Sequence, residues 1–144
     1  MKELRTEVEI RAPADRVWIA LTDFPSFPLW NPFIRRVDGE LRVGARLTVR
    51  IQLPNARSMT FRPRVLQVEP GRQLRWRGHL VMRGLFDGEH IFAIEPLGAR
   101  RARFVHREIF TGLLVPLLAR SVDRTTRRGF EAMNLALKAR AEGA

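Results

Sequence analysis

The chain has 144 residues, no cysteine and a formal net charge of +11, with 24 arginines but only two lysines. This length predicts one domain, residues 1–144, with a single core, and the lack of cysteine excludes disulfides, thiol nucleophiles and thiolate metal sites. The arginines are scattered along the chain without a nucleic-acid-binding motif, which favours a solvated basic surface over a nucleic-acid site.

The sequence also shows no signal-peptide pattern, no membrane-spanning run and none of the common catalytic motifs. The first residues alternate in charge, and the longest apolar run, Leu113 to Ala119, is too short to span a bilayer. No nucleophile elbow or glycine-rich phosphate loop is present. We therefore expect a cytoplasmic protein that is neither a serine hydrolase nor a nucleotide-binding enzyme.

The chain opens with a strand and two short helical segments. Residues 3–11 alternate apolar and charged side chains, which predicts a half-buried strand. Residues 13–22 predict a short helix. Residues 23–33 hold three prolines and four aromatic residues, which predict a helical turn and a loop packed on the core.

Alternating patterns continue through the middle of the chain and predict about six more strands. A change of apolar phase at residues 65–68 predicts a bulge. The predicted strands cover residues 34–38, 46–53, 58–69, 73–82, 85–95 and 101–110.

The last element is a long amphipathic helix over residues 113–142, with Pro116 in its first turn and Asn134 on its polar face. Its apolar face includes the small residues Ala119, Gly129, Ala132 and Ala136. Such a face either packs closely on a neighbour or leaves a gap. The element order predicts an α+β fold in which a curved antiparallel sheet of about seven strands wraps on this helix.

Several motifs resemble one superfamily. They are residues 10–18 (IRAPADRVW), Trp30-Asn31-Pro32-Phe33, Val68-Glu69-Pro70-Gly71 before Leu74-Arg75-Trp76, Gly88-Glu89-His90-Ile91-Phe92, and Arg103-Phe104 with Glu108 and Gly112. From about residue 3 to 140 the chain resembles START-like SRPBCC domains, the helix-grip superfamily that includes polyketide cyclase/dehydrase-like and lipid-transport-like domains and the birch-pollen allergen. The resemblance implies a cavity between sheet and helix.

Large apolar side chains on the inner face, opposite small ones on the helix, are compatible with an apolar pocket. Trp30 either caps the core beneath the proline-rich loop or lines the mouth of the cavity, and Met133 belongs to the core or to the ligand site. The candidate ligand-binding residues are Trp30, Phe33, Val49, Ile51, Phe61, Trp76, His90, Phe92, Phe104, His106, Glu108 and Met133.

Three of these residues are polar and share the inner face of the last two predicted strands. A turn centred on Gly98 places His90 opposite His106 and Glu108 opposite Gly88. Buried imidazoles and carboxylates need partners, so the group is a satisfied structural cluster, a site that orients a ligand, or an acid/base pair of Glu108 and His90. His79 is expected on the solvent face. The sequence shows no tight metal-ligand spacing, so we expect no metal and no cofactor.

The leading hypothesis is binding or transport of a small hydrophobic, lipid- or polyketide-like ligand by a monomer or homodimer. The alternative is a polyketide cyclase/dehydratase-type enzyme that uses Glu108 and His90. The second alternative is binding of nucleic acid or an acidic partner through the arginine-rich surface.

Overall fold

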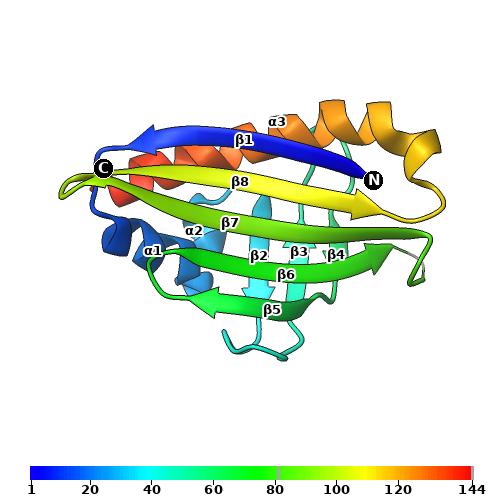
Figure 1. Ribbon diagram of the computed structural model, residues 1–144, viewed down its shortest axis with the longest axis horizontal. Coiled ribbons are helices and arrows are strands. Elements are labelled where there is room, and N and C mark those ends of the chain that lie inside the picture. The colour runs from blue at the N-terminus through cyan, green and yellow to red at the C-terminus, as the bar shows by residue number, and fades with distance from the viewer. Residues whose placement is uncertain (81, 144) are drawn as a thin grey trace.

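A computed structural model places the helices and strands in the predicted order (Figure 1). It describes residues 1–80 and 82–143, apart from the side chains of Leu80, Ala119 and Val122. The elements of the described residues are β1 (Lys2–Ile10), α1 (Ala14–Thr22), the 3-10 turn η1 (Phe24–Ser26), α2 (Phe27–Trp30), β2 (Ile34–Asp38), β3 (Thr48–Ile51), β4 (Met59–Phe61), β5 (Arg64–Glu69), β6 (Gln73–Leu80), β7 (Phe86–Gly98), β8 (Arg101–Thr111) and α3 (Val115–Ala141).

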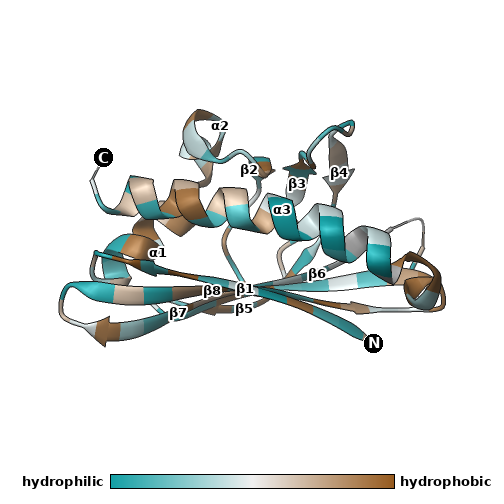
Figure 2. Cartoon of the chain, turned by 90° about the horizontal axis from the view of Figure 1, so that it is seen from above, coloured by the Kyte–Doolittle hydropathy of each residue, from teal (hydrophilic) through white to brown (hydrophobic). Residues whose placement is uncertain are grey.

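The strands form two antiparallel sheets. One has five strands in the order β1-β8-β7-β6-β5, and the other has three in the order β2-β3-β4. Helix α3 and the three-stranded sheet lie on the same side of the five-stranded sheet, and α3 packs mainly on β1 (Figure 2). The predicted α+β helix-grip fold is confirmed, with eight described strands in two sheets.

The prediction of one strand over residues 58–69 is wrong. The segment divides into β4 and β5, which belong to different sheets, and the break falls at Pro63. Proline has no N–H to donate to a strand ladder, and the Pro63 carbonyl instead accepts a hydrogen bond from the Leu47 N–H at 2.9 Å. The predicted bulge is confirmed between Val65 and Gln67.

The predicted register of the last two strands is also wrong, by two residues. The turn lies at Ala99 and Arg100 rather than at Gly98, with a register shift between Pro96 and Gly98. His90 therefore faces Glu108, and His106 faces Phe92. Because side chains alternate with a period of two, a shift of two residues changes the partners but leaves the inner face unchanged.

Helix α3 matches its predicted range and buries Phe130, Met133 and Leu137. Asn134 and Ala132 depart from the predicted faces of the helix: Asn134 is only 3% exposed, whereas Ala132 is exposed. Asn134 tolerates burial because it finds hydrogen-bond partners in the core, which the helical period does not reveal. The side chain of Ala119 lies outside the described residues.

Phe33 packs closely against α3 at Gly129. Asn31 is buried, and its Oδ1 accepts hydrogen bonds from the N–H groups of Phe33 and Ile34 at 3.0 and 2.9 Å, which fixes the turn that directs Phe33 inward. A Cβ atom on Gly129 would lie 2.5 Å from the Cδ1 atom of the Phe33 ring. The small face of the helix therefore packs closely at this point.

We expect Gly129→Ala to lower the free energy of unfolding by up to about 2 kcal/mol, because overpacking of the added methyl group against Phe33 costs about 1–3 kcal/mol. Intrinsic helix propensity works in the opposite direction, since alanine is favoured over glycine by about 1 kcal/mol. Urea unfolding measures the balance. The exposed Ala132→Gly is the control for propensity alone, and stabilisation by Gly129→Ala would show that Phe33 does not need this space.

Candidate functional site

The structure contains a pocket between the two sheets, with a volume of about 140 Å³. A cavity on the order of 150 Å³ accepts a benzene-sized molecule, so the pocket has room for a small ring system. Its wall is formed by Phe33, Val49, Ile51, Leu53, Met59, Phe61, Pro63, Trp76, Gly78, His79, Phe86, Gly88, His90, Glu108, Phe110 and Thr126.

The twelve candidate residues divide into two groups. Those in the pocket wall are Phe33, Val49, Ile51, Phe61, Trp76, His90 and Glu108. Those outside the wall are Trp30, Phe92, Phe104, His106 and Met133. Of the second group, Phe92, Phe104, His106 and Met133 are buried in the core. Trp30 is half-buried, packs against the core and makes an edge contact with Phe27 at a centroid distance of 5.2 Å.

Some residues of the pocket wall were not among the candidates from the sequence, although strand alternation pointed to several of them. Leu53 continues the alternation of Val49 and Ile51, and Phe86 and Phe110 alternate in phase with His90 and Glu108. Pro63 and Thr126 carried no such signal, because they reach the wall only through tertiary packing. His79 is exposed as predicted and borders the pocket.

Glu108 is the carboxyl group of the pocket wall. It projects from β8 toward Gly88 on β7, and a Cβ atom at position 88 would collide with its Oε2. Gly88 thus provides the space that the carboxyl group occupies. The side chain is 17% exposed, and its Oε1 lies 3.8 Å from His90 Nδ1, which is too long for a hydrogen bond.

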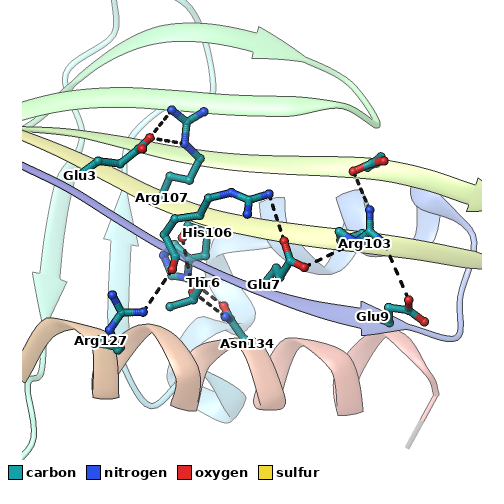
Figure 3. Close-up of polar contacts among 11 residues, drawn as sticks. Glu3, Thr6, Glu7, Glu9, Arg103, His106, Arg107, Arg127 and Asn134 are labelled. Atoms are coloured by element: carbon teal, nitrogen blue, oxygen red, sulfur yellow. Dashed lines mark hydrogen bonds and ion pairs between the residues drawn. The ribbon is translucent and has the colours of Figure 1, made fainter. Parts of the chain in front are cut away.

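Behind Glu108, a chain of hydrogen bonds crosses the core from β7 to β1. His90 Nε2 lies 2.6 Å from His106 Nε2, and His106 Nδ1 lies 2.9 Å from Asn134 Oδ1. Asn134 Nδ2 donates to Thr6 Oγ1 at 2.9 Å, and Thr6 Oγ1 donates to the His106 carbonyl at 3.4 Å. Figure 3 shows Thr6, His106 and Asn134 together between the sheet and α3.

The direction of this chain assigns both tautomers when the imidazoles are neutral. With the Asn134 amide oriented in this way, its oxygen accepts the proton of His106 Nδ1, so His106 Nε2 carries the lone pair. His90 Nε2 must then be the donor to His106, which leaves the lone pair of His90 on Nδ1, facing Glu108.

Burial determines the charges of the three titratable groups. Desolvation lowers the pKa of His106 to about 3, although its hydrogen bond with Asn134 acts in the opposite direction. Desolvation, and secondly the neighbouring His106, lower the pKa of His90 well below its usual value. Desolvation raises the pKa of Glu108 to about 8. Near neutral pH the site therefore holds two neutral imidazoles and a protonated carboxyl group.

The pKa of Glu108 predicts a dependence of stability on pH. From the ordinary pKa of 4.5 up to about 8, the unfolded chain loses the Glu108 proton while the folded chain keeps it, so rising pH favours the unfolded state. Glu108→Gln removes this effect. The Tm of the variant relative to the parent protein should therefore increase between pH 4.5 and 8 and level off above, as measured by calorimetry. A constant difference would show that Glu108 ionises alike in both states.

The arrangement offers one carboxylic acid to an otherwise largely apolar pocket, with a neutral imidazole lone pair behind it. Within the described residues, no three histidine, aspartate or glutamate side chains come together as a metal site. None of the described helices is long and apolar enough to cross a membrane.

Residues 1–142 match the family described as polyketide cyclase / dehydrase and lipid transport. The chain belongs to this family, and the resemblance to SRPBCC domains is confirmed. A comparison with curated protein sequences gives no match.

Solved structures share the fold at low sequence identity. The Zhui aromatase/cyclase from Streptomyces sp. R1128 is 22% identical, with a TM-score of 0.79 over 98% of this chain and 93% of that one. Norcoclaurine synthase from Thalictrum flavum is 15% identical, with a TM-score of 0.72 over 97% and 93%. The di-domain aromatase/cyclase BexL is 17% identical, with a TM-score of 0.75 over 96% of this chain, which spans only 47% of that chain.

Proposed function

We propose that this protein binds a small, mainly apolar ring compound that carries one oxygen, with the rings in the pocket and the oxygen hydrogen-bonded to Glu108. The observation that supports this most directly is the position of Glu108. Its carboxyl group borders a pocket whose wall is mostly aromatic and aliphatic, and it lies beyond hydrogen-bond distance of His90. A polar group placed in an apolar pocket fixes the orientation of a ligand.

The remaining features of the site agree with this role. His90 and His106 are already hydrogen-bonded through the core, so they hold their rings in place without a ligand. The volume of about 140 Å³ favours a compound of one or two rings. Membership of a family that includes lipid-transport proteins also supports ligand binding.

The probe that tests this proposal is 2-naphthol, which has an apolar bicycle and one hydroxyl group. Ile51→Trp fills the pocket from β3 and should weaken 2-naphthol binding by about tenfold or more, whereas Arg50→Trp, on the exposed face of the same strand, should not. Naphthalene, which lacks the hydroxyl group, should bind more weakly to the parent protein. Equal binding by both variants in a fluorescence titration would contradict the proposal.

A second candidate is a cyclase or dehydratase, and the pair of Glu108 and His90 favours it. A protonated Glu108 can donate its proton to a leaving hydroxyl group, while the lone pair of His90 accepts the proton that the substrate carbon loses. Water leaves, and the pair then holds a carboxylate and an imidazolium whose proton returns to Glu108. The 3.8 Å between Glu108 Oε1 and His90 Nδ1 brings the two groups close enough for this return after a small rotation.

Dehydration of 4-hydroxy-4-phenyl-2-butanone, a single-ring β-hydroxyketone, tests the second candidate. Glu108→Gln should lower turnover by about 10²–10⁴-fold while 2-naphthol still binds. In the parent protein, kcat/KM should fall as pH rises through about 8, because the acid form of Glu108 is lost. Unchanged turnover in the variant would remove Glu108 from the mechanism.

Binding of nucleic acid or an acidic partner, the second alternative from the sequence, is suggested by the net charge of +11. Across the outer face of the five-stranded sheet, arginines of β6 and β8 pair with carboxylates, as at Arg75–Glu89 and Arg107–Glu3. These pairs reduce the positive potential that a phosphate backbone would meet.

A further inference from the structure

One group of arginines differs from the rest of the surface. Arg46, Arg62, Arg64, Arg77 and Arg83 surround a second hollow of about 370 Å³, which also includes Leu66, Gly78, His79 and Asp87. We call these five arginines the arginine cluster. All five are exposed.

The cluster places like charges directly opposite one another. Arg64 on β5 pairs in register with Arg77 on β6, and on its other side it forms a bridge with Arg46. Three arginines thus form a row across three neighbouring segments. Like charges at directly opposed positions destabilise a sheet, so the row has a cost that a bound anion would relieve.

Few carboxylates offset this charge. Within the described residues, the only ion pair of the cluster joins Arg77 Nη2 to Asp87 Oδ2 at 3.2 Å, and the other oxygen of Asp87 accepts the Gly84 N–H at 3.0 Å. Arg46 and Arg64 donate to the backbone carbonyls of Arg62 and Gly44.

Arginines elsewhere on the sheet show the opposite arrangement. Figure 3 shows Arg107 with Glu3, and Arg103 with Glu7 and Glu9. The opposed arginines Arg5 and Arg107, on β1 and β8, each have their own glutamate. The sequence places carboxylates beside those arginines and leaves them out of the cluster, apart from Asp87.

The cluster adjoins the ligand pocket. Gly78 and His79 line both the pocket and the second hollow. Gly78 has no side chain, and a Cβ atom there would lie 3.5 Å from the side chain of Pro63, which also lines the pocket. The pocket and the arginine cluster therefore meet at these two residues of β6.

We propose that the arginine cluster binds the phosphate group of a phosphomonoester whose apolar part occupies the pocket. Guanidinium groups bind phosphate oxygens in pairs of parallel hydrogen bonds, and a dianion with three terminal oxygens uses more of the five arginines than a carboxylate does. This inference extends the proposed function and depends on it for the apolar part of the ligand.

Calorimetric titration at physiological ionic strength tests the proposal with three probes: inorganic phosphate, 2-naphthol and 2-naphthyl phosphate. The cluster variant is Arg62→Ala with Arg64→Ala, and the matched control is Arg120→Ala with Arg124→Ala, which removes two exposed arginines of α3. We expect the parent protein to bind 2-naphthyl phosphate at least tenfold more tightly than either other probe. The cluster variant should weaken this binding by about tenfold for each arginine, and the control by less than about twofold.

The probes separate the possible failures. Equal affinity for inorganic phosphate and 2-naphthyl phosphate would overturn the link to the pocket and leave a site for free phosphate. Equal losses in the cluster and control variants would overturn the site altogether, since bulk charge would explain the binding. Binding of 2-naphthol by the cluster variant shows that it is folded. Absence of 2-naphthol binding by the parent protein would instead contradict the proposed function, and inorganic phosphate would then test the cluster alone.

Discussion

The burial of two imidazole rings between the sheet and α3 is the constraint on which the rest of the site depends. A neutral imidazole has one donor and one acceptor, and in the core each must find a partner. His90 and His106 bond to one another through their Nε2 atoms, Asn134 and Thr6 complete the chain, and His90 Nδ1 faces the Glu108 carboxyl group at 3.8 Å. These partners come from β7, β8, α3 and β1, so the chain is complete only when all four elements are in register. The same register presents the His90 lone pair to Glu108.

Aromatic packing around the imidazoles explains why the pocket occupies only part of the interior. The His106 ring stacks on Phe130 with a centroid distance of 3.8 Å, and His90 stacks on Phe92 at 4.2 Å. This stack fills the space beside α3. The pocket begins beyond it, where Phe33 and the short strands β3 and β4 face β6, β7 and β8. The interior is therefore solid on one side of His90 and hollow on the other.

Local patterns in the sequence were sufficient for the fold and for the inner face of the strands, because both depend on periodicity and turn chemistry. They were not sufficient for details set by tertiary contacts. The turn at Ala99 and Arg100 shifted the partners of His90 by two residues, which alternation cannot detect. Asn134 lies in the core because its Oδ1 accepts from His106 and its Nδ2 donates to Thr6, although its helical position suggested exposure to solvent. His106 and Met133 face inward as expected but lie outside the pocket wall. The alternation of apolar and polar residues shows which side chains face the core, but not which of them border a cavity.

The contact between Phe33 and Gly129 also limits how this fold can diverge. The Phe33 ring occupies the space that a side chain at position 129 would need, so the two positions cannot change independently. A lineage that acquires a larger side chain at position 129 must carry a smaller one at position 33, which also lines the pocket. Coordinated exchange at two sites far apart in the sequence thus gives evolution a simple route to a different cavity size while the hydrogen-bond chain behind Glu108 is conserved.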